Sequence, residues 1–154
     1  MVRLPAFVRR FLVLVGLSTP ASGRDPLGPA GERAAARLLR RSGYRVLARN
    51  VRIHGGEADL VCLAPDRRTI VIVEVKSRRR GASESALSEV VPPEASVHAR
   101  KRANLARIAR TLARINRWEG HPLRIDVVAV EWPVGRGARP SLRHWVGAVP
   151  VGPR

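Results

Sequence analysis

The sequence predicts a single α/β domain in which a mixed sheet is flanked by helices, with the element order α-β-β-β-α-β-β. Two segments place apolar residues at intervals of three and four, as amphipathic helices do. Five shorter segments are rich in β-branched residues and are bounded by turn-forming residues, as strands are. A chain of 154 residues with 45% hydrophobic content is long enough to build one such core.

The first helix is expected in "GPAGERAAARLLRRSGY", residues 28–44. Pro29 lies near its start, Glu32 falls in the first turn, where the helix dipole favours an acid, and Gly43 ends it. The expected buried stripe consists of Ala35, Leu38 and Leu39.

Three strands should follow as an antiparallel meander, because the turn-forming pairs Gly-Gly and Pro-Asp separate them. Their expected bounds are Arg49–His54, Glu57–Leu63 and Thr69–Lys76. The third, "TIVIVEVK", has apolar residues on both alternating faces, which predicts a strand buried on both sides near the middle of the sheet.

The second helix is expected at about residues 97–118, after a loop that leaves room for a short helical piece. Lys101 lies four residues before Leu105 and continues the apolar stripe toward the sheet. The rest of that stripe is Ile108, Leu112 and Ile115, and the opposite face carries Arg107, Arg110, Arg114 and Arg117. The segments "LRIDVVAVEW" and "SLRHWVGAV" complete the sheet, the latter as an edge strand.

The domain is expected to cover residues 28–149, between an N-terminal extension at 1–27 and a tail at 150–154. The extension has two arginines, a short apolar run at residues 11–17 and then small residues, which is the outline of a secretory signal peptide. The run is too short to span a bilayer, so we expect no stable membrane insertion. We favour a mobile or loosely docked extension and keep a cleaved signal as the alternative.

The charge balance predicts a polyanionic partner. Twenty-nine Lys and Arg residues against twelve Asp and Glu give a formal charge of +17. Nucleic acid, DNA ahead of RNA, is the leading partner, and an anionic membrane surface is the second. One cysteine permits no internal disulfide and, with four scattered histidines, no zinc site, which fits a cytoplasmic protein. A homo-oligomer remains open.

Charged residues on two neighbouring strands predict a chemical site. Glu74 and Lys76 lie two residues apart, so a buried strand points both side chains to the same face. Glu57 and Asp59 should likewise share a face of the preceding strand, opposite Ala58, Leu60 and Cys62. In a meander Asp59 and Glu74 can converge, and carboxylates held close favour a hard divalent cation. With a lysine beside them, the set predicts phosphodiester hydrolysis assisted by Mg²⁺ or Mn²⁺.

At these residues the chain resembles a known family. "GGEADLV" and "VIVEVKSR", with "GERAAARLL" before them and "VHARK" and "RIDVVAV" after, resemble the YraN-like family of predicted nucleases. That family belongs to the PD-(D/E)XK superfamily of restriction-endonuclease-like and Holliday-junction-resolvase-like folds. The resemblance covers about residues 28–149 and implies a restriction-endonuclease-like sheet with nuclease chemistry.

The resemblance also implies residue roles. Asp59 and Glu74 match the metal-binding acids, Lys76 matches the catalytic lysine, and Lys101 matches a recurrent lysine that would support catalysis and contact nucleic acid. Glu32 corresponds to the acid that completes the metal site in resolvase-like members. Ala58 and Ser77 depart from the usual pattern without touching this chemistry, and the loop after residue 80 matches poorly, which leaves the choice of substrate open.

Each site residue also has an ordinary interpretation. Glu74 and Lys76 would make a partly buried ion pair, and Glu57, a candidate fourth metal ligand, would be a solvated residue beside a turn. Asp126 is expected to pair with Arg124. Three arginines of the second helix would be either a solvated face or a phosphate contact: Arg107, Arg110 and Arg114. Asp59 and the order of elements favour the catalytic interpretation, so the sequence predicts a Mg²⁺- or Mn²⁺-dependent endonuclease. The alternatives are a non-catalytic nucleic-acid-binding module, whose nuclease-like site is vestigial or is completed by a partner, and a peripheral membrane protein.

Overall fold

The computed structural model describes residues 27–53, 56–79, 99–118, 120–133 and 139–151. These residues form one five-stranded sheet and two helices, in the predicted order α-β-β-β-α-β-β. The elements are α2 (Leu27–Arg41), β1 (Arg45–Ile53), β2 (Gly56–Leu63), β3 (Ile70–Arg79), α4 (Ala99–Ile115), β4 (Leu123–Trp132) and β5 (Ser141–Val149). The predicted N-terminal extension and most of the loop before α4 lie outside the described residues.

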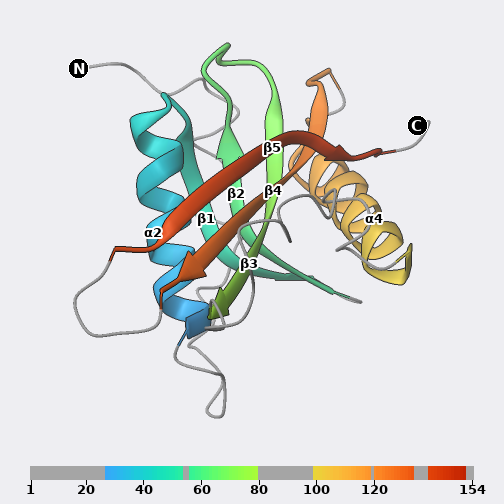
Figure 1. Ribbon diagram of the computed structural model, residues 1–154. Helices are drawn as coiled ribbons and strands as arrows, with labels where there is room; N and C mark the ends of the chain where they lie inside the picture. Colours follow the sequence, from blue (N-terminus) through green and yellow to red (C-terminus); the bar gives the residue numbers. More distant parts are fainter. Residues whose placement is uncertain (1–26, 54–55, 80–98, 119, 134–138, 152–154) are drawn as a thin grey trace.

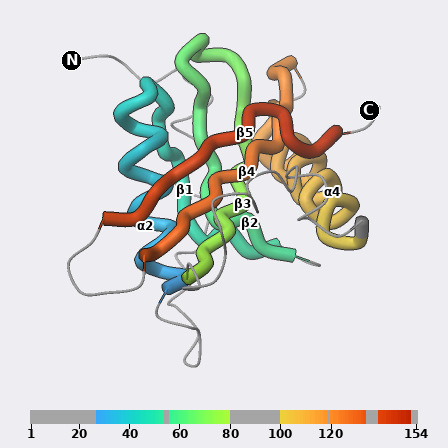
Figure 2. Tube along the Cα trace, viewed as in Figure 1, coloured from blue at the N-terminus to red at the C-terminus, as the bar shows by residue number. Residues whose placement is uncertain are grey.

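The strands are ordered in space as they are in sequence, β1-β2-β3-β4-β5. The first three form the predicted antiparallel meander, β4 runs parallel to β3 with α4 between them in the chain, and β5 returns antiparallel to β4. Helices α2 and α4 lie on opposite sides of the sheet (Figure 1), and the chain trace shows the strands crossing between them (Figure 2). The mixed α/β class predicted from the sequence is therefore confirmed.

Two hydrophobic clusters hold the layers together. One packs the apolar stripe of α4 against one face of the sheet, and the other packs α2 against the opposite face. Leu105, Ile108 and Leu112 are buried as predicted, but Ile115 is 50% exposed and that part of the prediction is wrong. The helix ends at Ile115, and the chain turns so that Trp118, fully buried, fills this end of the core instead.

Several element boundaries differ from the prediction. Helix α2 begins at Leu27, so its first turn contains no acid and Glu32 lies in the second turn. The dipole therefore does not account for Glu32, because its effect fades beyond the first turn. Strand β1 begins at Arg45 rather than Arg49, and β3 continues past Lys76 to Arg79. Because β3 continues to Arg79, Lys76 lies inside the strand and is paired with Ala129 of β4. This pairing fixes the direction of the Lys76 side chain.

Helix α2 is held close to β3 by a glycine. A Cβ atom at Gly31 would overlap Ser77 Oγ and lie 3.1 Å from Ser77 Cβ. We expect Gly31→Ala to destabilise the protein by about 1–2 kcal/mol, because Ser77 must rotate and the helix must move outward. Gly28→Ala on the same helix is the matched control, since a Cβ there meets nothing within 4 Å. Thermal unfolding of both variants checks this; equal melting temperatures would contradict the close contact.

Candidate active site

The candidate site lies where β2 and β3 separate. The two strands pair from Leu60 opposite Val73 to Leu63 opposite Ile70, and Asp59 is the residue just before this ladder. Asp59 Oδ2 accepts a hydrogen bond from the N–H of Val75 at 2.7 Å. The carboxylate thus takes the place of the backbone carbonyl that would continue the ladder. Beyond this point β3 remains paired with β4 as far as Arg79. This hydrogen bond fixes the Asp59 carboxylate at the edge of the opening between β2 and β3.

The side-chain alternation of β2 changes near Asp59. The sequence predicted that Ala58, Leu60 and Cys62 share one face of β2. Ala58 instead belongs to the hydrophobic cluster that packs against α4, whereas Leu60 and Cys62 belong to the cluster that packs against α2, so the prediction of one continuous face is wrong. The residue of β1 opposite Asp59 is Asn50, which has φ 50°, a left-handed conformation that asparagine tolerates. The alternation of β2 therefore changes opposite an irregular residue of β1.

Glu74 lies at the centre of the site and is only 4% exposed. Lys76 Nζ lies 3.1 Å from its Oε1, and Lys101 Nζ, from the first turn of α4, lies 3.0 Å from its Oε2. The prediction that Lys101 points toward the sheet is thus confirmed. The two amines offset the cost of burying the carboxylate. Oε2 is nevertheless buried without a well-aligned hydrogen-bond donor among the described residues, so its lone pairs are not fully used.

Asp59 is coupled electrostatically to this group. Burial, followed by repulsion from Glu74, raises the pKa of Asp59 from 3.8 to about 7. The N–H of Val75 and the charge of Lys101 act in the opposite direction, and Glu32 adds a smaller upward contribution. Asp59 and Glu74 therefore lie close enough for their charges to interact, and Lys101 is also within electrostatic range of Asp59. That the two carboxylates share one ion stays a prediction. A cation between the carboxylates would relieve the repulsion that raises this pKa.

The other two predicted metal ligands are not gathered into the same cluster. Within the described residues no three His, Cys, Asp or Glu side chains are close enough to hold a metal ion together. Glu57 forms an ion pair with Arg52 of β1 at 3.3 Å. Glu32 lies near enough to influence the pKa of Asp59, as the weakest of the contributions named above. Metal binding by Glu32 and Glu57 stays a prediction.

The chemistry of Asp59 and Glu74 fits a magnesium-like ion. Mg²⁺ is commonly held by one or two carboxylates and completes its octahedron with water and substrate phosphate oxygens. The two carboxylates supply hard oxygen donors, and the incompletely used Glu74 Oε2 is one of them. A bound ion would have to compete with the two lysine amines for Glu74, and both amines can move toward solvent because their side chains are 33% and 38% exposed.

The arginine-rich face of α4 is exposed, as predicted, at Arg107, Arg110 and Arg114. Arg117, which was predicted to continue this face, lies in the turn after the helix and has φ 56°. Arg110 Nη1 donates a hydrogen bond to the carbonyl of Val151 at 2.6 Å, which ties the C-terminal end of the described chain to the helix. Arg107 Nη2 donates to Asn104 Oδ1 at 3.2 Å. The face can therefore meet a phosphate backbone, although binding there stays a prediction.

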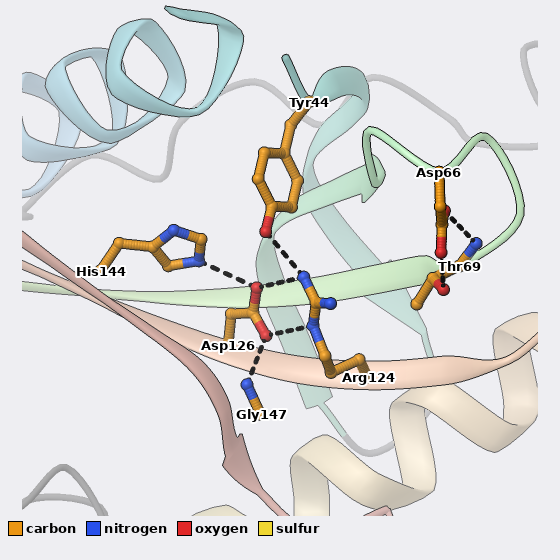
Figure 3. A network of polar contacts seen from close by, with 7 residues as sticks. All are labelled: Tyr44, Asp66, Thr69, Arg124, Asp126, His144 and Gly147. Carbon is orange, nitrogen blue, oxygen red and sulfur yellow. Dashed lines mark hydrogen bonds and ion pairs between the residues drawn. The ribbon is translucent and has the colours of Figure 1, made fainter. Parts of the chain in front are cut away.

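A second polar network, centred on Asp126, was only partly foreseen (Figure 3). The predicted pair with Arg124 is confirmed at 2.8 Å, but the fully buried carboxylate also receives the N–H of Gly147 and lies 2.9 Å from His144 Nε2. Burial pushes the pKa of Asp126 up, yet the donors from His144, Arg124 and Gly147 hold it below its ordinary value. The signal in the sequence was Asp126 itself, an acid within an apolar strand, because buried polar groups almost always have hydrogen-bond partners.

These features define the chain as an α/β protein with a carboxylate–lysine site at an opening in its sheet. It belongs to the uncharacterised protein family UPF0102, whose model matches residues 31–130 and so includes the whole site. A UPF0102 protein of Pelobacter propionicus is 36% identical over 131 residues, covering 85% of this chain and 87% of the relative. One from Symbiobacterium thermophilum is 46% identical over 112 residues, covering 71% and 86%.

A third relative, from Ectopseudomonas mendocina, is 43% identical over 110 residues, covering 71% of this chain and 85% of its own. The family assignment predicted from the sequence motifs is thereby confirmed. Among the described residues, neither helix has the length and apolar character that crossing a membrane requires.

Proposed function

We propose that this protein is a metal-dependent endonuclease that hydrolyses phosphodiester bonds in DNA or in structured nucleic acid. The observation that carries the proposal is the buried Glu74, placed beside Asp59 and contacted by Lys76 and Lys101 at the opening of the sheet. Buried carboxyl groups with a specific charge partner and a perturbed neighbour are candidates for functional sites. The formal charge of +17 supports a polyanionic substrate.

Each residue has a distinct role in this proposal. Asp59 and Glu74 would hold Mg²⁺ or Mn²⁺, which when bound polarises a phosphate and lowers the pKa of water. Lys76, next to Glu74 on the same face of β3, orients the attacking water and neutralises charge that develops on the phosphate. Lys101 approaches from α4, lies 3.0 Å from Glu74 Oε2 and attracts the phosphate. When substrate phosphate draws the amines away from Glu74, its oxygens become available to the ion.

A panel of nucleic acids tests the proposal. Purified full-length protein is incubated with duplex, single-stranded, flap and four-way-junction substrates, with Mg²⁺, with Mn²⁺ or with a chelator. We expect cleavage of at least one substrate that stops when the ion is removed. Absence of cleavage across all substrates with both ions would reject the catalytic proposal.

A non-catalytic nucleic-acid-binding module is the second candidate. Two observations favour it: both oxygens of Glu74 already face lysine amines, and the described residues contain no cluster of three metal-binding side chains. In such a module the acids and lysines would only stabilise the opening of the sheet. The module predicts tight binding in the panel without cleavage, and binding that is indifferent to divalent ions.

Both candidates predict binding that weakens steeply as salt rises, because neutralised phosphates release counterions. Replacing Arg107, Arg110 and Arg114 by Glu should weaken binding to all sequences and reduce the slope of log K against log salt by about 1 for each phosphate that the variant no longer neutralises. The matched control reverses three exposed arginines of α2: Arg33, Arg37 and Arg41. Fluorescence anisotropy at several salt concentrations measures the affinity and its salt dependence for both triple variants. Equal reductions of affinity in the two triple variants would mean that the α4 face makes no specific contact.

A further inference from the structure

A basic hollow lies apart from the candidate active site. It has a volume of about 470 Å³ and is lined by Arg40, Gly43, Tyr44, Arg45, Val46 and Arg67. These residues come from the end of α2, the start of β1 and the turn between β2 and β3. Glu74 lies five residues along the chain from the end of that turn, roughly 16 Å at the rise of a strand. The lining contains three arginines and no acid, so the hollow favours an anion.

One of these arginines has an unsatisfied group. Arg45 Nη1 is buried and has no hydrogen-bond partner among the described residues. A guanidinium nitrogen can only donate, and leaving a buried donor unpaired is costly. Burial first, and then repulsion from Arg40, lower the pKa of the nearby Arg49, while Glu32 acts in the opposite direction. An anion bound among these guanidinium groups would offset their mutual repulsion.

Tyr44 forms a rigid wall of the hollow. Its hydroxyl accepts a hydrogen bond from Arg124 Nη2 at 2.7 Å, and its ring meets the ring of His144 edge to face at 5.4 Å. Arg124 and His144 are both held by the buried Asp126, so the network in Figure 3 fixes the position of Tyr44. A preorganised wall lowers the entropic cost of binding a ligand.

The carboxylate of the turn, Asp66, is not among the residues that line the hollow. Asp66 accepts hydrogen bonds from the N–H groups of Arg68 and Thr69 and from the Thr69 hydroxyl, so its oxygens are engaged within its own turn. The next residue, Arg67, has φ 60°, a left-handed conformation that a side chain other than Gly, Asn or Asp rarely adopts. The turn thus keeps a strained arginine at the hollow.

We propose that this hollow binds a phosphate group, at a site separate from Asp59 and Glu74. Arginine forks match phosphate oxygens in paired hydrogen bonds, and Arg40, Arg45 and Arg67 surround the space in which such a group fits. The phosphate comes either from the backbone of a nucleic acid, as a diester, or from a terminal or free monoester. The site requires no hydrolysis, so it holds for a nuclease and for a binding module alike.

The test follows backbone amide signals of the full-length protein by NMR, in a chelator-containing buffer that prevents cleavage. Three probes are titrated: inorganic phosphate, a nucleoside monophosphate, and a dinucleoside monophosphate whose only phosphate is a diester. We expect saturable shifts at Tyr44, Arg45 and Arg67 with at least one probe. Tighter binding of the diester identifies the backbone as the source, and tighter binding of the monoester identifies a terminal or free phosphate.

Variants make the test specific. The double variant Arg45→Gln and Arg67→Asn removes two charges, and asparagine tolerates the φ of 60° at the second position. We expect it to weaken the tightest probe at least tenfold, while Arg139→Gln, at an exposed position before β5, leaves that affinity unchanged. An intact amide spectrum away from the hollow shows that the double variant folds. The proposal is overturned if no probe gives saturable shifts at the hollow, or if the double variant and the control bind equally.

Discussion

Glu74→Gln is expected to reduce metal-dependent cleavage by on the order of 100-fold or more, the typical loss when one preorganised charge-stabilising group is removed. The substitution keeps the size of a side chain that is 4% exposed and removes the charge that faces Lys76 and Lys101. Nucleic-acid affinity should survive or rise, because both amines become free to meet phosphate. Cleavage rates and anisotropy on the same substrate separate the two effects.

Two further variants assign the roles around Glu74. Asp59→Asn should lose cleavage in the same way, whereas Lys76→Ala should lose cleavage and leave both acids able to take up metal. Glu131→Gln is the matched control, since it makes the same change at an exposed position of β4 and should cleave as the wild type does. If Glu74→Gln cleaves at the rate of this control, the carboxylate has no catalytic role.

The second large effect concerns the pH dependence of stability. In the folded protein the pKa of Asp59 is about 7, against 3.8 ordinarily. Between about pH 4 and pH 7 the folded state therefore keeps a proton that the unfolded state has released, so stability falls as pH rises through this window. Above pH 7 the full cost of the buried charge is present. Asp59→Asn removes that cost and keeps an acceptor for the N–H of Val75.

We expect Asp59→Asn to melt a few degrees higher than the wild type at pH 8, a gain on the order of 1 kcal/mol, and nearly at the same temperature at pH 4. Calorimetry at several pH values measures this. Asp66→Asn is the control: hydrogen bonds from Thr69 lower the pKa of Asp66 to about 2, so its contribution is constant between pH 5 and 8. A parallel pH dependence of the Asp59 variant and the wild type would show that this carboxyl is not perturbed.

Periodicity and turn residues were sufficient to predict the order of elements and the direction of Glu74, Lys76 and Lys101. These side chains follow the strict repeats of a strand and of a helix, which the sequence displays directly. Ile115 followed the same repeat and yet lies exposed, because the chain leaves the helix there and Trp118 fills the space. Packing at a helix end depends on how the next segment turns, which periodicity does not describe.

The separation of β2 from β3 could not be predicted in the same way. At this point the carboxylate of Asp59 accepts the N–H of Val75 from the neighbouring strand in place of a backbone carbonyl, a contact between residues 16 positions apart. The partners of Asp126 lie up to 21 positions away along the chain, at Gly147, and the network continues from Arg124 to Tyr44, which is 80 positions from Arg124. Long-range contacts of this kind leave no local pattern in the sequence.

The most direct measurement is the equilibrium binding of Mn²⁺ to the full-length protein at pH 8, by calorimetric titration with a short non-cleavable nucleic acid present. At this pH most Asp59 carboxyls are ionised. The phosphates would compete with Glu74 for Lys76 and Lys101, which contact it at 3.1 and 3.0 Å. A metal site formed by Asp59 and Glu74 predicts saturable Mn²⁺ binding that Lys76→Ala retains and that Asp59→Asn and Glu74→Gln each weaken at least tenfold. Mn²⁺ binding that is absent in the wild type, or unchanged in both acid variants, would contradict a metal site formed by Asp59 and Glu74.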